Sequence, residues 1–174
     1  DSQKLEINDF EKKIKIALLS SFTISGLDES LKVKCSKKQI SYSSYVAGYN
    51  QYNQEILDEK SKLYKFSPDI TFLILDTRSI FGDLFYFPYS ITKSERKNFV
   101  DEKIHELLNL IKKFNETTTS KLVITNLGLP HYSPHGIAEM NTSYSFHDAI
   151  IDFNKKLKDK IIKMDSVHVF DFFK

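Results

Sequence analysis

Five short runs of apolar residues, each nearly continuous, set the strongest limit on the fold of this chain. A strand covered on one face alternates apolar and polar side chains, whereas a strand buried on both faces does not need to. The runs therefore predict inner strands of a parallel sheet. They span residues 14–19, 40–46, 70–75, 121–125 and 167–172. The second run alternates in part (SYSSYV), which favours an edge position for it.

Segments with helical periodicity separate these runs. We expect helices over residues 27–37, 52–64 and 145–163, and a long helix that begins after Ser94, with Ser94 as its N-cap and Glu95 in its first turn. Strand and helix alternate five times, which indicates a right-handed parallel sheet with helices on both faces. The predicted class is α/β, a three-layer α/β/α sandwich with a five-stranded parallel sheet.

Composition excludes several classes of protein. The single cysteine, Cys35, rules out an internal disulfide and a cysteine-based zinc site, and we interpret it as a buried thiol in a reducing, cytoplasmic compartment. Lys and Arg total 25 against 23 Asp and Glu, without a basic stripe, so nucleic acid is not expected as a partner. No apolar stretch approaches the ~20 residues of a membrane span, so no membrane association is expected.

The chain shows no repeat, linker or shift in composition, so residues 1–174 are expected to form a single domain. The sequence stops directly after the fifth run, without a helix to cover that strand. We therefore expect the full-length polypeptide to continue beyond it.

Polar side chains follow the predicted strands, where ligands of open parallel sheets bind. Ser21 and Thr23 follow the first strand and are candidates for a nucleophile or an anion site, or are simple capping residues. Asn50 and Gln51 follow the second strand and suit hydrogen bonding to a ligand or between loops. After the third strand, Arg78 is placed to clamp a phosphate or carboxylate, or to pair with Asp76.

Histidines offer two further arrangements. His131, His135 and Glu139 have a spacing that would ligate zinc on a helix, but Pro130, Pro134 and Gly136 forbid a regular helix there, so no metal site is predicted. Asp165 and His168 have the D-x-x-H spacing of a hydrolase, yet His168 falls within the fifth strand and is expected to point into the sheet packing.

An aromatic run follows the third strand. It comprises Phe81, Phe85, Tyr86, Phe87 and Tyr89. Aromatic residues are enriched in interface cores, so the run favours either a protein-interaction surface or a lid over the sheet edge.

Several ordered motifs run along the chain: KIALLSSFTISGL, the segment from VAGYNQYNQ to FSPDITFLILDTRSIF, VITNLGLPHYSPHGI, and AIIDFNKKL with VHVFDF. Together they resemble the N-terminal region of FkbH-like proteins of HAD superfamily IIIC. The resemblance implies a flavodoxin-like or SGNH-hydrolase-like domain in front of a HAD phosphatase-type domain. In that family the HAD part carries the aspartate nucleophile and Mg²⁺ and is associated with glyceryl units on acyl carrier proteins. Its D-x-D-x-T motif does not occur in these residues, so no cofactor is expected in this domain.

The chain departs from SGNH hydrolases where their catalytic blocks would lie. The first block reads Leu19-Ser20-Ser21-Phe22-Thr23, with the serine displaced by about one position, and Asp76-Thr77-Arg78-Ser79 replaces Gly-x-Asn-Asp. The resemblance thus predicts an accessory domain, degenerate as a hydrolase, whose partners are a following HAD domain and an acyl carrier protein. The alternatives are an active esterase or acyltransferase that uses Ser21 or Thr23, and an interaction module. By position, the candidate ligand-binding residues are Asn50, Gln51, Arg78 and Asn126.

Overall fold

The computed structural model of the chain describes residues 10 and 12–172. Its strands are β1 (Lys12–Ser20), β2 (Ile40–Val46), β3 (Ile70–Ile74), β4 (Lys121–Thr125) and β5 (Val167–Phe170). Its α-helices are α1 (Leu27–Lys37), α2 (Tyr52–Leu57), α3 (Lys62–Phe66), α4 (Thr77–Phe81), α5 (Lys93–Thr117) and α6 (Phe146–Ile161), and two 3₁₀ turns are η1 (Gly82–Phe85) and η2 (Gly136–Asn141).

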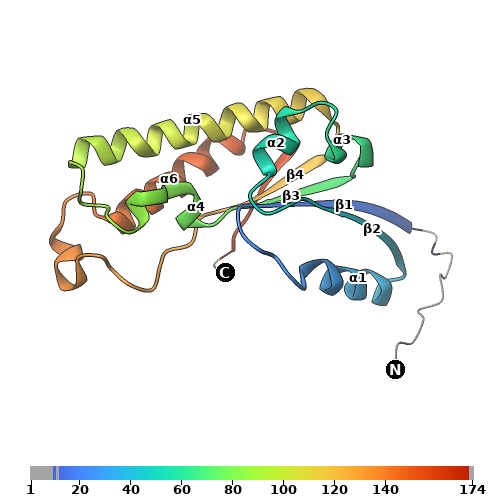
Figure 1. Ribbon diagram of the computed structural model, residues 1–174, viewed down its shortest axis with the longest axis horizontal. Helices are drawn as coiled ribbons and strands as arrows, with labels where there is room; N and C mark the ends of the chain where they lie inside the picture. Colours follow the sequence, from blue (N-terminus) through green and yellow to red (C-terminus); the bar gives the residue numbers. More distant parts are fainter. Residues whose placement is uncertain (1–9, 11, 173–174) are drawn as a thin grey trace.

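The five strands form one parallel sheet in the order β2-β1-β3-β4-β5. This confirms the predicted α/β class, and β2 lies at an edge as its alternating sequence suggested. Because all strands run in one direction, the loops that follow them gather along one edge of the sheet, at the left in Figure 1.

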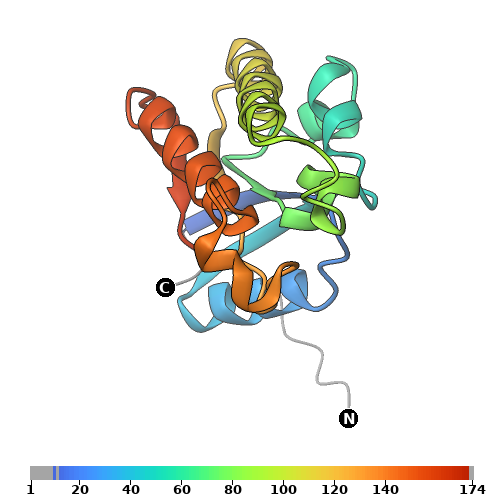
Figure 2. The same cartoon turned by 90° about the vertical axis from the view of Figure 1, so that its left-hand side faces the viewer.

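The helices divide unequally between the two faces of the sheet. Helices α2, α3, α5 and α6 lie on one face and α1 lies on the other (Figures 1 and 2). The core fills the first interface, where apolar side chains of the strands meet the buried stripe of α5 and α6. Its fully buried large side chains include Leu19, Leu73, Ile111, Phe114, Leu122, Ile124, Phe146 and Phe153. Helix α1, in contrast, buries none of its residues completely.

Two predicted helix boundaries are wrong for local reasons. The cap of α5 is Thr92, not Ser94, because Thr92 and Glu95 form a reciprocal capping box. The helix expected over 52–64 is broken into α2 and α3, because the Asp58 carboxylate accepts from the backbone N–H of Lys60 and stabilises a turn instead.

Three smaller expectations also need correction. The strand β5 ends at Phe170, and His168 is exposed on it and does not point into the packing. The thiol of Cys35 is half-buried, not buried.

Within residues 12–172, none of the helices combines the length and the apolar character that a bilayer crossing demands.

Candidate functional site

The strand ends are fixed to one another by backbone hydrogen bonds that continue past the strands. The Ser21 N–H donates to Ile74 O at 3.0 Å, and the Asn126 N–H donates to Phe170 O at 3.2 Å. Each loop on this edge therefore starts from a backbone position set by its neighbouring strand. The site is built on that rigid rim.

The first loop holds Ser20 and Ser21 through hydrogen bonds with backbone groups. Ser21 is fully buried, and its Oγ accepts a hydrogen bond from the Asp76 N–H at 2.9 Å. The hydroxyl of Ser20, also buried, donates to Phe22 O at 2.6 Å. A nucleophile needs an accessible hydroxyl with a base in hydrogen-bond reach. The contacts of Ser21 are instead to backbone groups and to Ser79, whose Oγ donates to Ser21 O at 3.2 Å.

The third loop is organised by Asp76, the N-cap of α4. Its carboxylate accepts from the Ser79 N–H at 2.9 Å and from Ser79 Oγ at 2.8 Å. The next residue, Thr77, donates from Oγ1 to Gly128 O at 2.5 Å and so joins the ends of β3 and β4. Sequence reasoning did not single out Thr77 or Ser79, although hydroxyl residues at a short helix start were a signal for such capping.

Arg78 does not form the expected ion pair with Asp76. Its Nη1 donates to the hydroxyl of Tyr86 at 3.1 Å, while Asp76 faces Ser79. The guanidinium is exposed and lines a pocket at the sheet edge. Of the ion pairs formed by the described residues, none involves Arg78.

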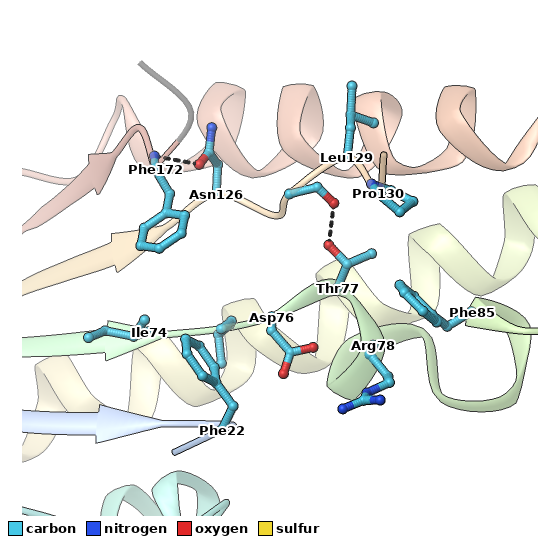
Figure 3. A pocket seen from close by; sticks show the side chains of 12 residues that line it. Phe22, Ile74, Asp76, Thr77, Arg78, Phe85, Asn126, Leu129, Pro130 and Phe172 are labelled. Atoms are coloured by element: carbon cyan, nitrogen blue, oxygen red, sulfur yellow. Dashed lines mark hydrogen bonds between the residues drawn. The ribbon is translucent and has the colours of Figure 1, made fainter. Parts of the chain in front are cut away.

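Asn126 joins the ends of the last two strands. Its Nδ2 donates to Asp171 Oδ1 at 2.9 Å, and its Oδ1 accepts from the Phe172 N–H at 2.9 Å. Both ends of the amide are therefore engaged within the protein. Asn126 lies in the same pocket as Arg78, at the opposite wall (Figure 3).

The other candidates are distributed over the edge. Thr23 is exposed and lines a separate, more polar hollow beside α1. Gln51 lines a third hollow next to α2, where its side chain lies against Gly48, and Asn50 is exposed in a left-handed turn conformation. The structure thus brings Arg78 and Asn126 together and leaves Thr23, Asn50 and Gln51 outside their pocket. The proposed roles of these residues stay predictions.

The pocket that Arg78 and Asn126 share has a volume of about 270 Å³ and lies beyond β1, β3, β4 and β5 (Figure 3). Most of its wall is apolar. The lining side chains are Phe22, Ile74, Leu75, Asp76, Thr77, Arg78, Phe85, Asn126, Leu129, Pro130 and Phe172, with Gly128 backbone between them. The volume is close to the lower limit of small-molecule sites, about 300 Å³. It suits a small ligand with an apolar part.

The loop that supplies Leu129 and Pro130 is held by a buried carboxylate. Glu139 is 4% exposed and accepts from Tyr89 OH at 2.6 Å, Ser133 Oγ at 2.9 Å and the His147 N–H at 3.1 Å. Burial alone would raise the pKa of Glu139, but these hydrogen bonds outweigh it and lower the pKa to about 2. Burial and the bond to this carboxylate raise the pKa of Tyr89 to about 12.

This arrangement also shows whether the spaced His131, His135 and Glu139 side chains come together as a metal site. Glu139 points inward, and the His135 ring stacks on Tyr89 with the ring centroids 3.5 Å apart. Within residues 12–172, no three His, Cys, Asp or Glu side chains gather closely enough to hold a metal ion, so His131, His135 and Glu139 do not form a zinc site.

The aromatic run divides between core and surface. Phe81 is buried and packs on Phe146, with ring centroids 5.6 Å apart, whereas Tyr86 and Phe87 are 52% and 68% exposed. Phe85 lies between the two groups and lines the pocket. The run is therefore partly a small core over the sheet edge and partly an exposed aromatic surface.

The sequence of the chain was compared with known protein families. The family model described as FkbH, N-terminal domain, matches residues 15–174. This chain belongs to the FkbH N-terminal domain family. A search of curated proteins found no match.

Two solved structures are similar in fold to this FkbH N-terminal domain. The first is the N-terminal part of the protein BF1531 from Bacteroides fragilis, containing a phosphatase domain complexed with Mg, with a TM-score of 0.74 and 18% identity. The match covers 92% of this chain but 41% of that one. The second is the lipase Lip_vut3 from a goat rumen metagenome, with a TM-score of 0.57 and 12% identity over 92% of this chain and 80% of the lipase. At these identities the likeness shows the fold alone.

Proposed function

We propose that this chain is the accessory domain of an FkbH-like enzyme, and that it positions a substrate or an acyl carrier protein for a HAD phosphatase-type domain in the same polypeptide. Support for the arrangement comes from the family itself, which is defined as an N-terminal domain, and from BF1531, where a similar domain accompanies a phosphatase domain. Glyceryl or phosphoryl transfer to the carrier would be the chemistry of the HAD domain.

The observation that carries the accessory role is the state of Ser21. In an SGNH-type hydrolase the serine after the first strand attacks the substrate, and a histidine takes its proton. Here Ser21 is fully buried and its Oγ accepts from the Asp76 N–H. The buried hydroxyl is not presented to a substrate, and this supports a role other than hydrolysis for the domain.

Magnesium belongs to the proposed HAD domain. The described residues of this chain offer no cluster of carboxylates or histidines that fits the ion. We assign no step of metal chemistry to them.

Deletion of residues 1–174 from the full-length polypeptide tests this function. Turnover of p-nitrophenyl phosphate, which needs only the phosphatase-type domain, should change less than about twofold. Transfer to a carrier protein should fall at least about tenfold, because the positioning surface is lost. Transfer that is unchanged by the deletion would contradict the proposal.

The active-hydrolase alternative has its own test on the isolated chain. p-Nitrophenyl acetate should be hydrolysed no faster than by the Ser21→Ala and Thr23→Ala variants. Turnover that either variant abolishes would restore the esterase or acyltransferase interpretation.

A further inference from the structure

We propose that the sheet-edge pocket binds a phosphate monoester with a short apolar chain, with the phosphate on Arg78 and the chain against Phe22, Leu129 and Phe172. This inference names the ligand class of the proposed positioning site, and it rests on the proposed function for the choice of phosphate as the anion.

The polar side chains of the pocket narrow the ligand class. Thr77 donates to Gly128 O, and Asn126 is engaged at both ends of its amide by Asp171 and Phe172. The Asp76 carboxylate accepts two hydrogen bonds from Ser79. These groups stabilise the rim and are not directed at a ligand. A ligand rich in hydroxyl groups would therefore find few partners in this pocket.

Among the polar side chains of the pocket, Arg78 differs because most of its hydrogen-bond donors remain available to a ligand. The structure records one hydrogen bond from its guanidinium, to Tyr86 OH at 3.1 Å, and a guanidinium carries five N–H donors. Its exposure leaves it able to bind a phosphate with two parallel bonds. Tyr86 acts as a positioning residue that orients the side chain. The carboxylate of Asp76, two residues earlier, accepts hydrogen bonds from Ser79.

The remaining wall selects an apolar chain. Phe22 follows β1 and Phe172 follows β5, and their rings lie at the same end of the pocket (Figure 3), while the loop after β4 adds Leu129 to the lining. A volume of about 270 Å³ accommodates a short chain and its charged head, but not a long acyl tail. Each methylene that this wall covers should tighten binding about fourfold.

The position of the cation gives the proposal a chemical sense. Arg78 places a full positive charge in α4, at the edge of the pocket. A fixed cation suits an anion that is already charged in the ground state, as a phosphate ester is.

Titration of the 174-residue chain with monobutyl phosphate, followed by backbone amide NMR shifts, tests this inference. Inorganic phosphate and 1-butanol serve as ligands that carry one half of the molecule each. We expect shifts at residues 76–79 and 126–129, and affinity for monobutyl phosphate at least about tenfold higher than for either half. Equal affinity for inorganic phosphate, or shifts elsewhere in the sheet, would overturn the proposal.

Paired variants assign the two halves of the pocket. Arg78→Ala should weaken binding at least about tenfold and Arg78→Lys less, whereas Lys65→Ala, which removes an exposed cation from α3, should change it less than about twofold. Leu129→Ser should weaken binding about fivefold, and Ile162→Ser, at an exposed site after α6, should not. Unchanged binding by Arg78→Ala in a chain with a native amide spectrum would also overturn the proposal.

The outcome is separable from that of the deletion experiment. Carrier transfer that depends on residues 1–174, without binding of monobutyl phosphate, overturns this ligand class and leaves the accessory role in place. Binding of monobutyl phosphate at Arg78, together with carrier transfer that the deletion leaves unchanged, overturns the accessory role and leaves this ligand class in place.

Discussion

Two polar networks lie at the same end of the molecule and hold their segments by different means. The rim network of Ser21, Asp76 and Ser79 connects strand ends that the sheet ladder has already aligned. The loop network connects Glu139 to Tyr89, 50 residues away, where no ladder exists. The rim is therefore fixed both by the ladder and by side chains, whereas the 129–147 loop is joined to distant segments by side-chain contacts alone, and Glu139 makes three of the hydrogen bonds that hold it. The two regions should respond very differently to single substitutions.

Glu139→Ala should produce the largest effect. It leaves the Tyr89 hydroxyl and the His147 N–H without this acceptor and removes one of the two acceptors of the Ser133 hydroxyl, and we expect a loss of about 3 kcal/mol in the free energy of unfolding. Urea denaturation measures this loss, and hydrogen exchange should rise over residues 129–147. Glu102→Ala, at an exposed position of α5, is the matched control and should stay within about 0.5 kcal/mol.

Acid should weaken the loop network through the same group. The pKa of Glu139 in the folded protein, about 2, lies below its ordinary value, so its stabilisation is present above that ordinary value and is lost as the pH falls through the folded one. We expect the free energy of unfolding to decrease by roughly 3 kcal/mol between about pH 5 and pH 2 from this group.

The Glu139→Gln variant isolates that contribution. Burial alone would raise the pKa of Asp152, but hydrogen bonds from Lys156 and Tyr144 lower it. Other carboxylates therefore also contribute to the acid response of the whole protein. The wild type and Glu139→Gln should therefore converge in stability toward pH 2. A constant difference between them across this range would show that the Glu139 charge is not responsible.

Ser21→Ala should have an intermediate effect. The half-buried Asp76 N–H loses its acceptor, and a loss of about 1–2 kcal/mol is expected while the ladder retains the strand ends. Thermal unfolding followed by circular dichroism measures it, with Ser25→Ala, an exposed serine of the same loop, as control. A loss as large as that of Glu139→Ala would mean that the rim is not redundantly fixed.

Arg78→Ala should be nearly neutral for stability, within about 0.5 kcal/mol, because the guanidinium is exposed and forms one recorded hydrogen bond. The same denaturation measurement checks this. A large loss would place Arg78 in the structural network and not in the ligand pocket.

The same difference separates what the sequence could predict from what it could not. Continuous apolar runs and the helical stripe from Val100 to Phe114 depend on local periodicity, and they predicted the sheet and α5 correctly. Parallel strand ends share an edge, so Arg78 and Asn126 could be expected near one another. Leu129 and Phe172 could not, because apolar residues beside strand ends look like core in a sequence.

Interactions between distant segments could not be predicted either. Glu139 drew attention as a metal ligand because of its spacing from His135, and its partners became visible only when the fold brought Tyr89 beside it. The split between α2 and α3 could not be predicted for a related reason. A single side chain, Asp58, outweighs the helical periodicity around it.

The proposed role of the sheet edge is to hold a ligand without a serine nucleophile. Intact mass spectrometry of the chain after incubation with a fluorophosphonate probe checks this, because such probes bond covalently to activated serines. We expect no adduct, since the Ser21 hydroxyl is buried and hydrogen-bonded to the Asp76 N–H. A stoichiometric adduct that disappears in Ser21→Ala would instead identify an active serine hydrolase.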